Sequence, residues 1–218
     1  MEDIKEEKQG RMSKFSVELG LFDYINPICY LVTSITLLLN LTKSPWFLMY
    51  LVGAIISLIF GFTIPTLKLL IGLGKLEFKM PVNIVFYVNS GIFVSGLALF
   101  KIVKNISNIM FLGIILIVLL LLFLIYKKTN KFNTIAVLIG AAGYLLIYIS
   151  LISLAISANY IASAILYGIA IVLFVFLILV GIKANLKDAR VHWVIEICNV
   201  CCQLSVAIST VLLFKQIS

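Results

Sequence analysis

The chain has 218 residues, of which 63% are hydrophobic and only 12% are charged, and its mean hydropathy is +1.19. A soluble domain of this length needs a more polar surface, so the composition excludes that class and predicts a polytopic membrane protein. The net charge of +8 does not indicate nucleic-acid binding. The Lys and Arg residues lie between apolar runs, where they set orientation and contact lipid headgroups.

Seven apolar runs are long enough to cross a bilayer, so the predicted fold class is an all-α bundle of seven transmembrane helices. The first 20 residues are polar and lack the apolar core of a signal peptide, which predicts a cytoplasmic tail or an interfacial helix at 1–20. The membrane domain is expected at 21–214, followed by a short tail at 215–218. Its spans are expected at about 21–40, 46–70, 81–100, 109–126, 132–155, 160–182 and 191–214.

The first two spans each contain a proline. Asp23 stands at the entrance of the first span, and Pro27 follows at a position compatible with the first turn of a helix. In the second span Pro65 is expected to kink the helix, since it removes one backbone hydrogen bond. Small residues recur at every fourth position of that span, which favours close helix contact in lipid: Gly53, Ser57 and Gly61.

The middle spans differ in polarity. The third span is the most polar after the last and carries Asn83 and Tyr87. The fourth is almost entirely Ile, Leu, Val and Phe, which predicts a peripheral helix surrounded by lipid. The fifth and sixth are joined by a very short loop, and Ala164 and Gly168 lie four residues apart in the sixth. These two spans are therefore expected to form a tight antiparallel hairpin.

The basic residues predict the orientation. Seven spans place the termini on opposite sides of the membrane, and the side with more Lys and Arg is cytoplasmic. The N-terminal side holds twelve: Lys5, Lys8, Arg11, Lys14, Lys75, Lys79, Lys127, Lys128, Lys131, Lys183, Lys187 and Arg190. The opposite side holds four: Lys43, Lys101, Lys104 and Lys215. The N terminus is therefore expected in the cytoplasm and the C terminus outside.

The last span carries a narrow polar stripe. His192, Glu196, Asn199 and Gln203 follow one another at spacings of four, three and four in an otherwise apolar run. At about 100° per residue these side chains fall within an arc of about 60°. An ionised group facing lipid would cost about 2.5–3.5 kcal/mol at the bilayer centre. Glu196 is therefore expected to face the bundle interior.

The predicted orientation places the strongly polar groups of four spans at one depth, in the cytoplasmic half. We therefore expect a polar cavity open to the cytoplasm between the first, second, third and seventh helices. Lys68 is the expected charged partner of Glu196, although it could instead reach the headgroups, as His192 could beside Trp193. Asn199 and Gln203 could equally serve as interhelical contacts. The expected lining residues are Asn26, Lys68, Asn83, Tyr87, His192, Glu196, Asn199 and Gln203.

A one-sided polar cavity beside a proline-containing helix favours a transporter or channel for a small polar solute or ion, with Glu196 as a group that could carry a proton. One alternative is a non-catalytic membrane subunit, sensor or immunity protein that acts by binding partners. Another is a membrane-embedded enzyme that acts on a lipid-linked substrate through His192 and Glu196. The last span has no lysine before Lys215, which argues against a retinal Schiff base there.

No cofactor or metal is expected. The chain has one histidine, and its four cysteines lie in apolar segments, where packing is the more common role. The expected location is the cell membrane, with multiple passes. The expected partners are the lipid bilayer and a small molecule or ion, with a homo-oligomer or a partner membrane protein left open.

Overall fold

The computed structural model describes residues 16–76, 82–129, 132–183 and 189–217, and within them every regular element is a helix. Most of the predicted tail, residues 1–15, lies outside this part of the chain. Seven helical segments are long and apolar enough to cross a membrane, which confirms the all-helical fold class and the seven predicted helices. The elements are α2 (Val17–Asp23), α3 (Ile25–Asn40), α4 (Phe47–Gly72), α5 (Val82–Lys104), α6 (Asn108–Thr129), α7 (Phe132–Ser157), α8 (Ile161–Lys183) and α9 (Ala189–Ile217).

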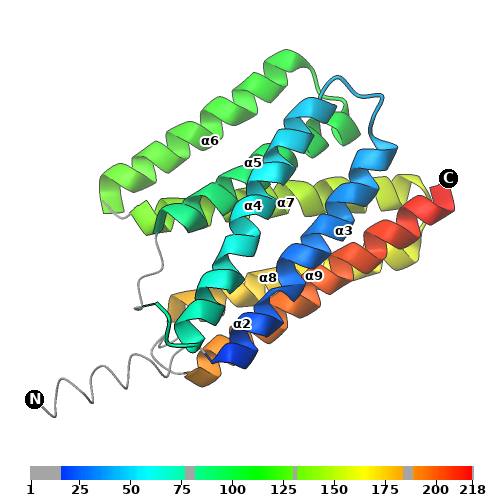
Figure 1. The fold of residues 1–218 in the computed structure, drawn as a ribbon. Coiled ribbons are helices and arrows are strands. Elements are labelled where there is room, and N and C mark those ends of the chain that lie inside the picture. The colour runs from blue at the N-terminus through cyan, green and yellow to red at the C-terminus, as the bar shows by residue number, and fades with distance from the viewer. Residues whose placement is uncertain (1–15, 77–81, 130–131, 184–188, 218) are drawn as a thin grey trace, which may run out of the picture.

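The start of α2, the end of α4 and the start of α9 meet at one end of the bundle, which we call the α2 end (Figure 1). There Leu19 and Ile71 are buried against Trp193, whose aromatic ring centroid lies 5.8 Å from that of Phe22. The last helix finishes at the opposite end (Figure 1). The two ends of the described chain are therefore far apart, as an odd number of crossings requires.

The first span is broken, which the sequence analysis did not predict. Tyr24 separates α2 from α3, and its backbone N–H bonds to the carbonyl of Leu21 at 3.3 Å. The cause is Pro27, which lacks an N–H for the carbonyl of Asp23 four residues earlier and whose ring crowds that carbonyl. Pro27 lies in the first turn of α3, as predicted. Asp23 thus ends one helix at the point where the next begins.

Small residues bring α4 against α5. A Cβ atom built on Gly53 would lie 2.5 Å from the backbone nitrogen of Ser95, and one on Gly91 would lie 2.5 Å from the Ser57 Oγ. Only glycine fits such an approach of two backbones, so the predicted close contact is confirmed for Gly53 and Ser57. Gly61, the third member of the repeat, is less crowded, since its Cβ would meet only the Pro27 Cβ at 3.7 Å.

The same kind of contact joins α5 to α7. A Cβ on Gly143 would lie 2.6 Å from the backbone nitrogen of Phe93, and Asn89 donates from Nδ2 to the Ala136 carbonyl at 2.9 Å. Helices α4, α5 and α7 therefore form a tightly packed scaffold. The polar side chain of Asn89 serves this scaffold as an interhelical contact.

Helices α7 and α8 form the predicted hairpin, in which Tyr144 and Tyr148 of α7 pack on Phe174 of α8, but the tight contact predicted at Gly168 is wrong. A Cβ at that position would meet nothing within 4 Å, so Gly168 is not at a tight interface. Helix α8 instead directs polar groups to α9: Ser163 Oγ donates to the Ser209 carbonyl at 2.9 Å, and the Tyr167 hydroxyl lies 3.0 Å from Thr210 Oγ1.

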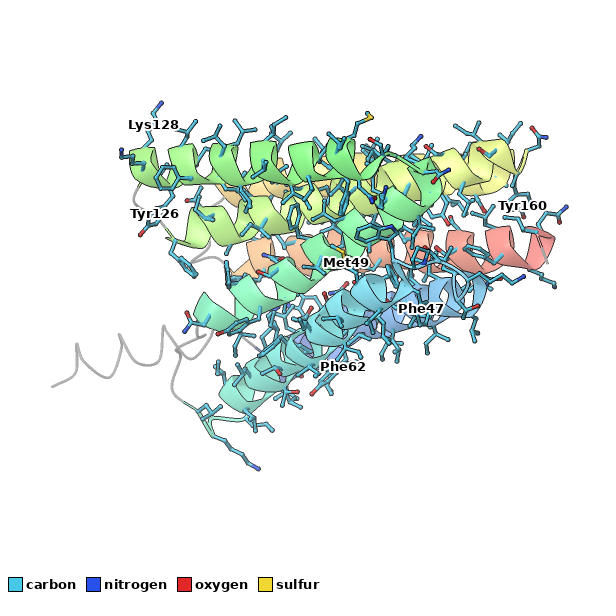
Figure 2. All side chains as sticks on the ribbon, turned by 90° about the horizontal axis from the view of Figure 1, so that it is seen from above. Phe47, Met49, Phe62, Tyr126, Lys128 and Tyr160 are labelled. Carbon is cyan, nitrogen blue, oxygen red and sulfur yellow. The ribbon has the colours of Figure 1, made fainter. Side chains whose placement is uncertain are left out.

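Helix α6 lies at the edge of the bundle, as predicted. Only 6% of its apolar stretch is buried, against 50% for α9. The side chains of α6 spread outward, and Tyr126 and Lys128 lie at one end of the molecule (Figure 2). Tyr160, which follows the α7–α8 turn, lies at the other end (Figure 2). Tyrosines at both ends of the bundle suit the two interfaces of a membrane.

Candidate functional site

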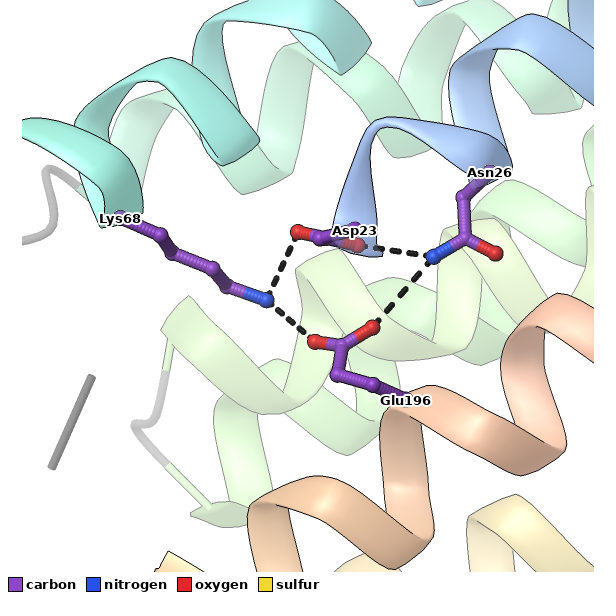
Figure 3. A network of polar contacts seen from close by, with 4 residues as sticks. All are labelled: Asp23, Asn26, Lys68 and Glu196. Carbon is purple, nitrogen blue, oxygen red and sulfur yellow. Dashed lines mark hydrogen bonds and ion pairs between the residues drawn. The ribbon is translucent and has the colours of Figure 1, made fainter. Parts of the chain in front are cut away.

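Three ionisable side chains from three different spans meet inside the α2 end of the bundle. Asp23 ends α2, Lys68 lies near the end of α4, and Glu196 lies about two turns into α9. Their exposed fractions are 6%, 8% and 7%. The Lys68 Nζ lies 2.8 Å from Asp23 Oδ2 and also forms an ion pair with Glu196 Oε1 (Figure 3). One ammonium group thus bridges two buried carboxylates.

Asn26 closes this arrangement from the other side. Its Nδ2 donates to Asp23 Oδ1 at 2.7 Å and to Glu196 Oε2 at 3.3 Å (Figure 3). We call Asp23, Asn26, Lys68 and Glu196 the polar quartet. Each of the four carboxylate oxygens accepts from Lys68 or Asn26, so both carboxylates are held in fixed positions.

Two quartet members come from one short stretch that contains the helix break. Asp23 and Asn26 are three residues apart, on either side of Tyr24. Because α2 ends at Asp23, the side chains of Asp23 and Asn26 belong to two helices and still hydrogen-bond to each other. Any change in the angle between α2 and α3 would therefore alter the quartet.

The quartet has an unbalanced charge. With all three ionisable groups charged, two carboxylates face one ammonium, so the quartet carries a net charge of −1. An uncompensated charge in a low-dielectric interior is costly, and it is usually balanced by a proton, an ion or a ligand. The arrangement is therefore suited to hold one additional positive charge.

The quartet forms one side of a cavity of about 190 Å³. This is room for several water molecules or one small solute. Within the described part of the chain, the other lining residues are uncharged: Pro27, Tyr30, Ser57, Gly61, Ile64, Val88, Ile92, Tyr144, Asn199 and Gln203. The cavity is thus polar on the α3 and α9 side and largely apolar where α5 contributes to it.

Several polar groups of the cavity wall already have protein partners. Gln203 Nε2 donates to the Tyr144 hydroxyl at 3.2 Å, and the Tyr30 hydroxyl lies 2.9 Å from Ser95 Oγ. Ser57 Oγ donates to the Val88 carbonyl at 3.3 Å. In contrast, the Asn26 Oδ1 is buried and has no hydrogen-bond partner among the described residues. It is an acceptor left over after both Asn26 N–H groups are used.

Five of the eight residues expected from the sequence line this cavity: Asn26, Lys68, Glu196, Asn199 and Gln203. Tyr87 does not; it is 45% exposed and stacks on Phe60 at 4.7 Å. Asn83 is exposed as well. Helix α5 turns Val88 and Ile92 toward the cavity, and Tyr87 and Asn83 lie about 100° and 140° away from Val88 around that helix.

His192 is also absent from the cavity lining. It lies one turn before Glu196, about 6 Å nearer the α2 end, and its side chain is half-buried. The residues that sequence reasoning missed are Asp23, Tyr30, Ser57 and Tyr144. For Asp23 a signal was present, since it lies four residues before Pro27, where a helix break places a side chain between two helices.

No family model matches the chain, and neither a curated protein nor a solved structure matches it. Its function must therefore be argued from its own geometry. Among the described residues, no group of three His, Cys, Asp or Glu side chains is arranged to hold a metal ion. Cys29 and Cys202 are buried free thiols, and Cys202 lies 3.2 Å from the Tyr148 hydroxyl, away from the quartet.

Proposed function

We propose that this protein is a membrane transporter for a small polar solute or ion, whose binding site is the cavity beside the polar quartet. The observation that supports this is three buried ionisable side chains facing a cavity inside a bundle of apolar helices. Buried ion pairs add little net stability compared with well-packed apolar residues, so packing alone gives little reason for them. Ionisable groups within membrane spans usually mark ion or substrate pathways.

The predicted orientation assigns the cavity to one side of the membrane. The excess of Lys and Arg on the N-terminal side places the α2 end in the cytoplasm, so the cavity would load and release its ligand there. Transport further requires a second conformation. The break at Tyr24 is the kind of helix interruption that transporters use at their binding sites, and Pro65 removes one backbone hydrogen bond inside the continuous helix α4. Glu196 would be the group that couples a proton to this movement.

The cavity lining contains no histidine, so the alternative of an enzyme with His192 as base and Glu196 as its partner has less support. A partner-binding subunit remains the competing proposal. It differs from a transporter in a measurable way, since it would move no solute by itself. A liposome experiment with the purified protein therefore separates the two.

The experiment uses the full chain reconstituted into liposomes, with uptake measured for a panel of small neutral, cationic and anionic solutes. We expect uptake of at least one solute above protein-free liposomes, and a loss of at least tenfold in Glu196→Gln. Glu18→Gln is the matched control, because Glu18 is an exposed carboxylate on α2 and its loss changes the total charge equally. Equal uptake in the wild type, in Glu196→Gln and in empty liposomes would refute the proposal.

A further inference from the structure

We propose that the ligand of the cavity carries one positive charge, and that this ligand and a proton occupy the polar quartet in turn. The inference rests on the proposed function for its biological meaning, but it concerns binding and can be tested without transport. It names the class of ligand, a small monovalent cation or a small amine, and it predicts exchange of that ligand against a proton.

The charge of the cavity favours a cation. The two carboxylates exceed the single ammonium by one charge, and every other lining residue that the structure describes is neutral. Lys68 is already bonded to both Asp23 and Glu196, so an anion would have to displace one of them to reach it. A cation needs no such displacement, since it approaches a group whose net charge is already negative.

The available acceptors also favour a cation. The Nδ2 of Asn26 donates to both carboxylates, and its Oδ1 points away from them without a partner among the described residues (Figure 3). The carbonyls of Asp23 and Gly61 lack their helical donors, because Pro27 and Pro65 stand four residues later. Oxygen acceptors without competing donors suit a hard cation or an ammonium group.

The size of the site limits the ligand. Three residues line both the 190 Å³ cavity and a second cavity of only about 10 Å³: Tyr30, Tyr144 and Gln203. That space is at most enough for one water molecule. A solute that enters from the α2 end therefore stops beside the quartet. An inorganic ion or methylammonium fits there.

Exchange follows from charge balance. A proton on the carboxyl of Asp23 or Glu196 makes the quartet neutral, and so does one bound cation with both carboxylates ionised. Both together would leave a buried charge of +1, so binding of the cation releases the proton to water. Among the described residues that line the cavity, the titratable groups are the quartet's own members together with Tyr30 on α3 and Tyr144 on α7, and the described lining residues of α5 are Val88 and Ile92.

The test measures thermal unfolding of the full chain in detergent, with sodium, potassium or methylammonium chloride replacing N-methyl-D-glucamine chloride at constant ionic strength. We expect at least one probe to raise the unfolding temperature saturably at pH 8. Its apparent affinity should weaken, by up to tenfold per pH unit, as the pH falls through the range in which the proton binds. No stabilisation by any probe, or stabilisation that does not depend on pH, would overturn the proposal.

Charge variants provide the second arm. Asp23→Asn makes the quartet neutral, so the apparent affinity for the cation should fall at least tenfold. If this variant does not fold, Glu196→Gln removes the same charge from α9 and should have the same effect. The double variant with Lys68→Met added to Asp23→Asn restores the charge of −1 and should recover the response. Glu18→Gln, on the exposed face of α2, should respond as the wild type does.

The outcomes separate this inference from the proposed function. Saturable cation binding without any uptake in liposomes would refute transport and leave the charge argument standing. Uptake of a neutral or anionic solute without stabilisation by cations would support transport and refute the assignment of a cationic ligand. A cation response that survives in Asp23→Asn and in Glu196→Gln would show that the ion binds elsewhere, which overturns the assignment to the quartet.

Discussion

Removal of the Lys68 ammonium should destabilise the protein strongly, and more so at alkaline pH. The Lys68→Met variant keeps most of the apolar stem but leaves Asp23 and Glu196 facing each other without a cation. Both carboxylates are less than a tenth exposed, so solvent screens them little. Breaking a buried ion pair in this way costs about 3–5 kcal/mol. For a chain of this size that corresponds to a fall in unfolding temperature of about 6–20 °C.

The pH dependence follows from the charge of the variant. Without Lys68 the quartet carries −2 when both carboxylates are ionised, and protonation of one carboxylate reduces this to −1. The loss of stability should therefore be largest at pH 8 and smaller at pH 5. Thermal unfolding in detergent at both pH values measures it, with Lys75→Met as control, since Lys75 is exposed just after α4. If the two variants unfold at the same temperature at pH 8, the Lys68 ammonium does not stabilise the two buried carboxylates and the reasoning fails.

Three further variants test the fold around the site. Gly53→Ala places a Cβ against the α5 backbone and should cost about 1–3 kcal/mol in thermal unfolding, whereas Gly113→Ala, with nothing within 4 Å, should cost almost nothing. Pro27→Ala supplies an N–H to the carbonyl of Asp23 and should join α2 to α3, so liposome uptake should fall while the unfolding temperature does not. Asn83→Ala should leave uptake unchanged, because Asn83 is exposed and outside the cavity lining; a tenfold loss would place it in the pathway.

The seven spans could be predicted from the sequence because a membrane helix needs only a sufficiently long apolar run. The meeting of Lys68 with Glu196 could also be predicted, since alternating spans place the end of the second and the start of the seventh at one depth. Depth, however, does not determine the direction in which a side chain points. Tyr87 lies at a depth close to that of the cavity residue Val88, yet it is turned outward by one residue of helical rotation.

Asp23 shows why the charge predicted for the site was incomplete. A carboxylate at the start of a span is usually a headgroup residue, and a continuous first helix would have given no reason to place it inside. The break at Tyr24 changes this. Helix α2 lengthens the first span to begin at Val17, so that Asp23 lies inside the span and is buried against Lys68. With Glu196 alone, Lys68 would form a neutral pair with no need of a ligand. With Asp23 as the third member, the same lysine leaves one negative charge unbalanced, and that excess is the reason to look for a cation.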